Sequence, residues 1–185
     1  MKIGSLPQRA LIGSFLLASA SLSAPALAAT DGTLGATSTG TVSITASVPS
    51  RVRISGLTDI DFTNQDPATA ASSAQNVCVW SNTATKAYTI TATGSGAGSA
   101  FTLSNGSAAV SYEVQWAGIS GAMAGTTLTA GSASSSFSST ATNQNCASGP
   151  SASASLIVGL GTGALSAMNA GANYTGTLTL LVTPL

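Results

Sequence analysis

Residues 77–91 read VCVWSNTATKAYTIT and contain two strand-like segments. Val77–Trp80 and Tyr88–Thr91 are rich in β-branched and aromatic residues, which favour β-strands. Ser81-Asn82 begins the connection between them, so the two segments predict two successive strands.

The same pattern recurs on both sides of this pair. Residues 42–48 alternate apolar and hydroxyl side chains with the two-residue period of a strand that buries one face, and Pro49 ends the pattern. Asn105-Gly106 predicts a hairpin turn between two further strands. Additional short strands are expected at 51–54, 60–62, 101–103, 112–116, 156–158 and 176–183.

Helical signals are weak throughout. One helical turn is expected at most, in residues 163–169, and residues 117–145 are predicted to be either loops or a weak edge strand. Seven or more short strands separated by turn signals predict an all-β fold, an antiparallel β-sandwich.

The first 28 residues have the features of an export signal. Lys2 and Arg9 precede an apolar run at 10–22, and Ala26-Leu27-Ala28 fits a cleavage site, whereas the run is short and Ser-containing for a membrane anchor. We therefore expect a signal peptide at 1–28, a flexible extension at 29–40, and a single sandwich domain at 41–185. The mature chain would have 185 − 28 = 157 residues.

Charge argues against several partners. Charged residues make up 5% of the chain, against about 25% in ordinary proteins. Without the signal peptide, three basic and five acidic residues remain, and no basic run is present for nucleic acid or for an anionic membrane surface. We expect neither nucleic-acid binding nor membrane insertion of the mature form. Such a surface suits a packed assembly or simply a secreted protein.

The residue types also argue against a catalytic or metal-binding function. With no histidine, the chain lacks the commonest general base and most transition-metal sites. Asp59 and Asp61 alternate with apolar Ile60 and are expected on a solvated face. We therefore expect no catalytic residues, no cofactor and no metal.

Cys78 and Cys146 are the two cysteines of the chain. An even count in an exported protein predicts a disulfide, because the compartment is oxidising. The aromatic residues leave two alternatives open, core packing or a sugar-stacking platform; they are Trp80, Tyr88, Tyr112 and Trp116.

Five segments resemble subunits of chaperone-usher surface fibres, nearest to the spore coat U domain group of archaic pilins and to the alpha-fimbrial major subunits. The segments are TVSITASVPSRVRISGL (41–57), VCVWSN (77–82), AYTITATGSG (87–96), SYEVQWAG (111–118) and AGANYTGTLTLLVTP (170–184). The family ending is matched by Gly171, Tyr174, Gly176, Leu178 and Leu180, with one extra residue between the glycine and the tyrosine. Pro184-Leu185 departs from the penultimate aromatic of other pilins.

The resemblance implies an incomplete immunoglobulin-like sandwich that is completed by a donor strand, first from a periplasmic chaperone and then from the next subunit. By position, the donor strand is 41–48, with Val42, Ile44, Ala46 and Val48, and the C-terminal strand that borders the acceptor groove carries Tyr174, Leu178, Leu180 and Val182. The alternation at 41–48 would equally suit the first strand of a self-contained sandwich.

The function implied is that of a structural subunit of a pilus or fimbria, exported through the periplasm to the cell surface and supporting adhesion or biofilm formation. Its expected partners are other fibre subunits, a periplasmic chaperone and an outer-membrane usher. The alternative is a secreted, monomeric β-sandwich module that binds carbohydrate or another surface.

Overall fold

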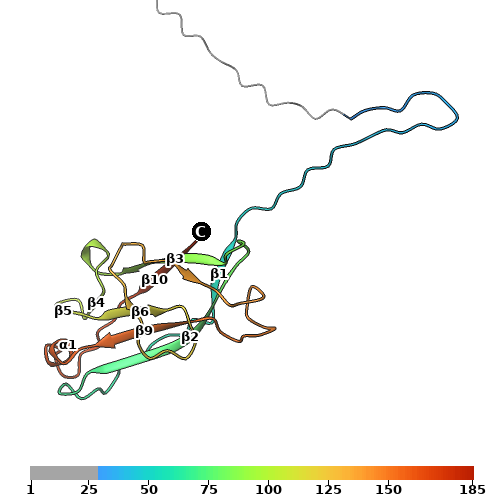
Figure 1. Cartoon of the computed structure of the whole chain (residues 1–185). Coiled ribbons are helices and arrows are strands. Elements are labelled where there is room, and N and C mark those ends of the chain that lie inside the picture. The colour runs from blue at the N-terminus through green and yellow to red at the C-terminus, as the bar shows by residue number, and fades with distance from the viewer. Residues whose placement is uncertain (1–28) are drawn as a thin grey trace, which may run out of the picture. The chain divides into compact units, whose positions relative to one another are not determined.

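The computed structural model of the chain describes residues 29–185, which divide between Ser47 and Val48 into two units (Figure 1). The predicted signal peptide lies outside the described residues. In the first unit, residues 29–47 are exposed, and Thr30 and Thr41 exchange two backbone hydrogen bonds of 3.0 and 2.9 Å. The flexibility predicted for 29–40 stays a prediction.

The second unit contains the strands of the described residues, together with a 3-10 turn at Ala97–Ser99 and one short helix, α1 (Thr162–Ser166). The strands are β1 (Val52–Ser55), β2 (Ala71–Ser81), β3 (Ala87–Gly94), β4 (Thr102–Ser104), β5 (Ala109–Ser111), β6 (Glu113–Ala117), β7 (Thr126–Thr127), β8 (Phe137–Ser138), β9 (Ala154–Leu160) and β10 (Leu178–Pro184).

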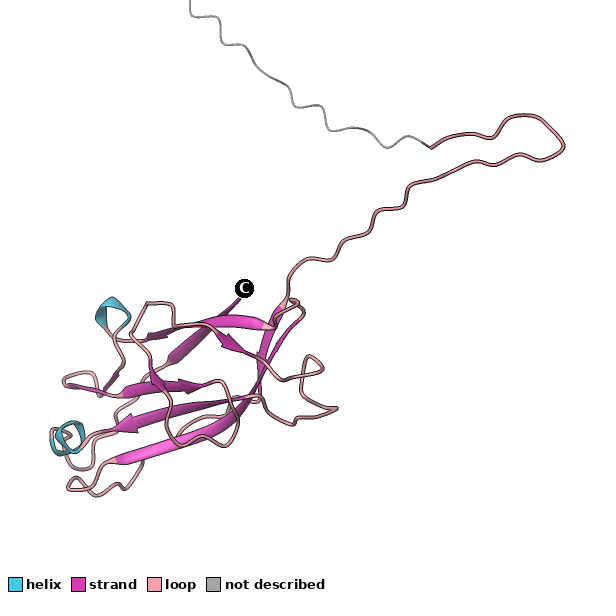
Figure 2. Ribbon diagram, viewed as in Figure 1, coloured by secondary structure: helices cyan, strands magenta, loops and turns pink. Residues whose placement is uncertain are grey.

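These strands form two main sheets in which every pair is antiparallel (Figure 2). One sheet has the order β1-β2-β9-β6-β7 and the other β10-β3-β8, while β4 and β5 form a separate hairpin. Side chains from both sheets share one core, so the predicted all-β antiparallel sandwich is confirmed.

The strand order matches an immunoglobulin-type sandwich that lacks its last strand. In the constant-type arrangement, strands A, B, E and D form one sheet and C, F and G form the other. Here β1-β2-β9-β6 occupies the positions A-B-E-D, and β3 and β10 occupy C and F. The position of G, beside β10, is unoccupied within residues 29–185.

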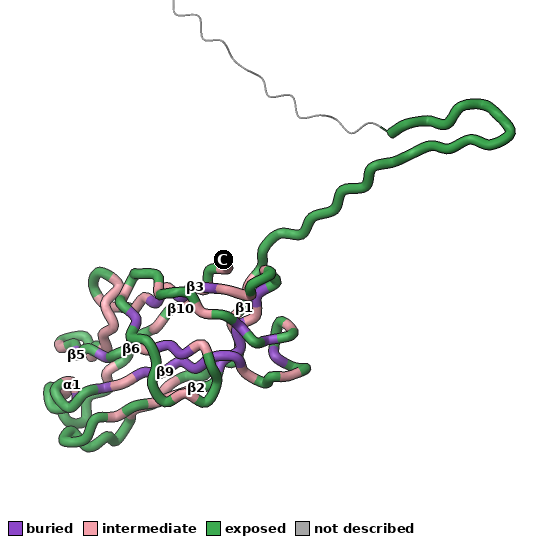
Figure 3. Tube along the Cα trace, viewed as in Figure 1, coloured by how far each residue is buried: buried purple, intermediate pink, exposed green. Residues whose placement is uncertain are grey.

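The core lies between the sheets, where alternate side chains of the long strands pack together. Figure 3 shows the buried residues along these strands. Val77 and Val79 of β2 and Tyr88 and Ile90 of β3 are fully buried. β9 is buried on almost its whole length; it lies between β2 and β6, and Ser155 on it bonds to Ile119 and Ala122.

Local differences from the sequence-based predictions have identifiable causes. The alternating residues 42–48 form no strand, because a strand requires a bonded neighbour and this segment has none among the described residues. Residues 60–62 also form no strand, although Ile60 and Phe62 still pack against the core while Asp59 and Asp61 are exposed. The Asn105-Gly106 turn joins β4 to the three-residue β5, and the strand expected at 112–116 crosses to the larger sheet as β6.

Candidate functional site

The last strand, β10, is bonded on one side only. It stands at the edge of its sheet and pairs with β3 from Leu178 opposite Gly94 to Pro184 opposite Tyr88. Its side chains alternate strictly, since Leu178, Leu180 and Val182 turn toward the core while the residues between them are exposed. β10 therefore presents an apolar inner face at an open edge.

The direction of the β10 backbone groups follows from the hydrogen bonds at its end. The N–H of Leu185 donates to the carbonyl oxygen of Ala87 at 2.9 Å, which makes these two residues a hydrogen-bonded pair. Such pairs alternate along an antiparallel ladder, so the next ones fall at Thr183, Leu181 and Thr179. The N–H and C=O groups of Leu180 and Val182 consequently point away from β3, toward the open edge.

The hydrogen bonds on the other side of β3 support this assignment. Ile90 exchanges hydrogen bonds with Ser134, through an N–H to Oγ contact of 2.9 Å and an N–H to O contact of 2.8 Å in return. Ile90 lies opposite Val182 in the register, and its backbone groups thus point toward the β8 side. The odd-numbered residues of β3 are left to bond β10, as the pattern at Leu185 requires.

A second open edge lies nearby, on β1. The N–H of Asn82 donates to the carbonyl oxygen of Arg51, so the backbone groups of Val52 and Ile54 point away from β2 by the same alternation. β1 and β10 approach each other but share no ladder. Each of the two sheets therefore ends, at this border, in a strand with unpaired backbone groups.

The core side chains are less buried at this border than at the centre of the smaller sheet. Tyr88, Ile90 and Ala92, on the inner face of β3, are all 0% exposed. The inner side chains of β10 and β1 are only half-buried, although they belong to the same core. An additional strand at this border would cover them.

The segment predicted as a donor strand has exposed side chains. Val42, Ile44 and Val48 are 76%, 91% and 82% exposed, and Ala46 is exposed as well. These four residues are spaced by two, as are the inner residues of β10. Whether the segment is donated stays a prediction.

The other predicted residues of this region fall in two places. Leu178, Leu180 and Val182 lie together on the inner face of β10, whereas Tyr174 precedes the strand, and its hydroxyl accepts a hydrogen bond from the N–H of Asn169 at 3.2 Å. The sequence-based prediction did not include Val52 and Ile54 in the site. Their alternation with Arg51 and Arg53 was the available signal.

The predicted disulfide is confirmed. Cys78 of β2 and Cys146 are bonded, with their Cα atoms 5.9 Å apart. The bond fastens residues 139–149 over the outer face of β2, where the hydroxyl of Ser139 also donates to the carbonyl oxygen of Val79.

The aromatic platform weighed as an alternative is wrong for three of its four residues, because they are buried. Tyr88, Tyr112 and Trp116 belong to the core, and the rings of Tyr88 and Trp116 meet edge to face at 6.5 Å. Trp116 Nε1 donates to the Tyr88 hydroxyl at 3.2 Å. Burial raises the pKa of Tyr88, with the hydrogen bond from Trp116 opposing the rise, and burial also raises the pKa of Tyr112. Of the four, Trp80 alone is only partly buried.

Residues 29–185 contain no cluster of three or more metal-ligating side chains. Within the same residues, no helix has the length and apolar character needed to cross a membrane.

The chain matches no protein-family model and no curated protein sequence. Among solved structures, it is similar to a chain of a chaperone-tip adhesin complex in the biogenesis of CFA/I fimbriae, with 16% sequence identity and a TM-score of 0.46. The match covers 74% of this chain and 41% of the other, so it spans less than half of the length of that chain.

Proposed function

We propose that the chain is a non-enzymatic structural subunit of an exported surface fibre, in which residues 41–48 of one copy add as a strand to the open edge of β10 in the next copy. The observation that carries this proposal is the edge itself, where Leu180 and Val182 combine outward-pointing backbone groups with half-buried side chains.

The spacing of the exposed segment fits this edge. In a hydrogen-bonded antiparallel pair, the two side chains lie on the same face of the sheet. Residues placed opposite Leu180 and Val182 would therefore point into the core, and the next inward position follows two residues later. Val42, Ile44, Ala46 and Val48 supply apolar side chains at that spacing.

Burial of the segment favours the addition. Full burial of a Val or Ile side chain contributes about 1.5–3 kcal/mol, and three such side chains are now 76% exposed or more. Fixing the backbone costs about 1–2 kcal/mol for each residue, so the new ladder hydrogen bonds and the covering of β10 and β1 have to contribute as well. Strand addition with pockets for alternate side chains is an established mode of recognition.

The open edge of β10 also bears on the partners of the chain. An apolar, unbonded edge is a template for unspecific pairing, so it has to be covered before assembly. A periplasmic chaperone as the first partner would provide that cover. In line with the resemblance to chaperone-usher subunits, the proposal also includes an outer-membrane usher as the site of assembly and a cell-surface fibre supporting adhesion or biofilm formation as the product.

The direct test compares two substitutions in the exposed segment. Ile44→Asp places a carboxylate where the added strand must face the core, whereas Thr45→Asp places the same charge on the opposite face. Loss of the Ile side chain and burial of a carboxylate together cost at least about 3 kcal/mol, which is more than a hundredfold in affinity.

Multimer ladders of the mature protein on unheated gels provide the measurement. We expect Ile44→Asp and deletion of 41–48 to abolish the ladders, and Thr45→Asp to retain them. Ladders that persist after the deletion would overturn the proposal.

A further inference from the structure

The charged side chains of the second unit are sorted toward two ends of the sandwich. Its basic residues are Arg51, Arg53 and Lys86. Arg51 and Arg53 line a shallow hollow together with Trp80 and Gln144. Lys86 donates from Nζ to the carbonyl oxygen of Ala141 at 3.3 Å, in the loop that also carries Gln144. All three cations thus surround the loop fastened by Cys146.

The acidic residues lie toward the other end. Glu113 of β6 pairs with Gly159 of β9, and Gly159 pairs with Ser72 at the beginning of β2. Glu113 lines a hollow with Ala70 and Ala71, and Asp66 belongs to the turn just before them, which closes through a hydrogen bond from the Thr69 N–H. Asp59 and Asp61 lie on the segment that leads to this turn.

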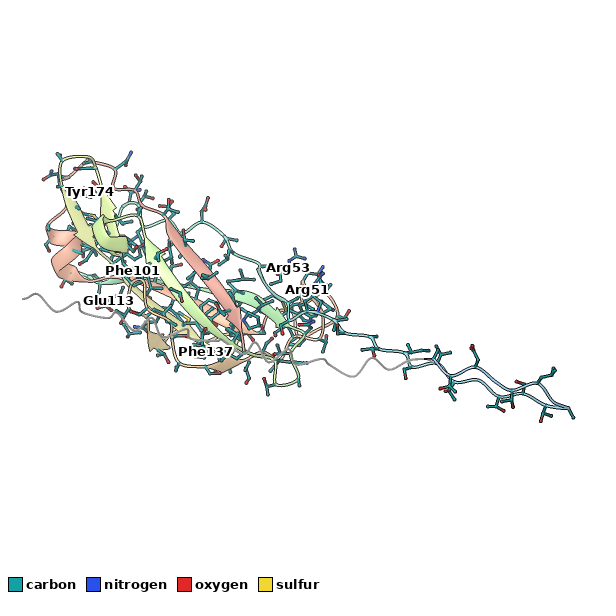
Figure 4. All side chains as sticks on the ribbon, turned by 90° about the horizontal axis from the view of Figure 1, so that it is seen from above. Arg51, Arg53, Phe101, Glu113, Phe137 and Tyr174 are labelled. Carbon is teal, nitrogen blue, oxygen red and sulfur yellow. A yellow bond between two sulfur atoms is a disulfide. The ribbon has the colours of Figure 1, made fainter. Side chains whose placement is uncertain are left out.

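The register gives the separation of the two groups. Arg53 stands opposite Trp80 of β2, while Ser72 marks the level of Glu113 on the same strand. The eight residue steps from 72 to 80 span about 26 Å at ~3.3 Å per step. Figure 4 shows Arg51 and Arg53 far from Glu113 along the sandwich. This separation exceeds the screening length of about 8 Å in physiological salt, so the two groups act independently within one copy.

One end of β10 lies near the basic residues, and its other end lies near the acidic residues. Its C-terminal end adjoins Ala87, next to Lys86. Its N-terminal end begins at Leu178 opposite Gly94, which lies against Ala100. The following residue, Phe101, accepts the Tyr112 N–H at 3.0 Å, and Tyr112 precedes Glu113. β10 therefore runs from the acidic end to the basic end.

Resting on the proposed strand addition, we infer that consecutive copies meet through an ionic contact, in which Arg51 and Arg53 of the incoming copy face the acidic end of the accepting copy, with Asp66 and Glu113. Arg51 follows Val48 by three residues, so it lies within about 10 Å of the end of the added strand. An antiparallel strand ends at the acidic end of β10. A parallel strand would instead bring the arginines to the acceptor's own cations, so the charges select antiparallel addition.

The ionic contact affects the rate of assembly more than the stability of the assembled copies. Exposed ion pairs contribute only about 0–1 kcal/mol each, but complementary patches accelerate encounter and exclude wrong orientations. In a chain with so few charges, the two patches are the dominant long-range interaction between copies. The partner they fit is a second copy of this chain.

The test uses the full mature protein, transferred from denaturant into buffer at low and high salt, with the appearance of ladders followed in time. We expect assembly to slow about tenfold between low and high salt, and R51E/R53E to be about tenfold slower at low salt, without the salt dependence. The quadruple variant R51E/R53E/D66K/E113K restores opposite charges and should recover the original rate to within about threefold.

The outcomes separate this inference from the proposed function. If R51E/R53E assembles at the original rate, or if the quadruple variant stays as slow as R51E/R53E, the ionic contact is overturned while strand addition stands. If assembly does not depend on Ile44 at all, the strand addition itself is wrong. Circular dichroism confirms that each variant folds, which is expected because all four positions are exposed.

Discussion

Two proline substitutions on β10 distinguish the open edge from the bonded one. Val182→Pro removes an N–H that points toward the open edge, whereas Leu181→Pro removes one that bonds β3. The residues are neighbours on the same strand, so propensity for extended structure is similar at both. The substitutions should nevertheless affect different processes.

The magnitude follows from the hydrogen bond that each change deletes. A backbone hydrogen bond contributes about 1 kcal/mol, and the carbonyl group left without a partner adds a penalty of about 1–3 kcal/mol. For Val182→Pro, a total of about 2 kcal/mol appears in the affinity for the added strand, roughly a thirtyfold loss. For Leu181→Pro, a similar amount appears in the free energy of unfolding of the isolated subunit.

The assay uses a labelled peptide of residues 41–50 and acceptor chains that all carry Ile44→Asp, so that they cannot assemble with one another. Fluorescence anisotropy gives the dissociation constant, and urea unfolding gives the stability of each acceptor. If Val182→Pro binds the peptide as well as its parent, or destabilises the subunit as much as Leu181→Pro does, the direction assigned to the edge groups is wrong.

Three further outcomes are expected. Leu180→Asp should abolish peptide binding because its side chain faces the core, while Leu181→Asp, at a 59% exposed position, should leave binding within about threefold of the parent by the same assay. Replacing both Cys78 and Cys146 with Ala should lower the free energy of unfolding by about 4 kcal/mol, since the bond closes a loop of 68 residues; denaturant titration measures this, and an unchanged midpoint would contradict it. Stability should fall as the pH rises above 10, because burial raises the pKa of Tyr88 above the unfolded value of 10.0 and the unfolded chain therefore loses its proton first; thermal unfolding at pH 8 and pH 11 provides the comparison.

The strands that could be predicted from the sequence are those whose own side chains distinguish a buried face from an exposed face. Val77–Trp80, Tyr88–Thr91 and Leu156–Val158 all lie in long strands, because β-branched and aromatic residues there fill the core of the sandwich. The C-terminal segment is a strand for the same reason. In each case, local pattern and tertiary packing agree.

Residues 117–145 could not be placed from the sequence. Leu128 and Phe137 are isolated anchors in a run of small residues, and the strands beside them, β7 and β8, have two residues each. Such short strands exist only because β6 and β3 offer bonding partners, and a local pattern contains no information about a distant partner.

The candidate site could be predicted only in part, because half of it depends on the pairing of strands that are distant in sequence. The inner residues of β10 could be identified from alternation at 178–182, but the open edge is a property of the sheet order. That order depends on β1 pairing with β2 and on β10 pairing with β3, which leaves the two edges at one border. The separation of the charges could not be predicted either, because Asp66 and Glu113 are far apart in sequence and are brought to the same end of the sandwich only by the pairing of β2, β9 and β6.

The lengths of the four edge strands set β10 apart. β7 and β8 have two residues each and β1 has four, so these edges are too short to bind another chain stably. β10 has seven residues, LTLLVTP, with no charge, and its proline is the final residue, where it blocks nothing upstream. Natural sheets normally protect such an edge with lysine, an internal proline or a bulge. An unprotected edge would promote aggregation unless a specific strand occupied it, and the exposed segment at 41–48, whose outward side chains are Ser43, Thr45 and Ser47, provides a neutral strand of matching period.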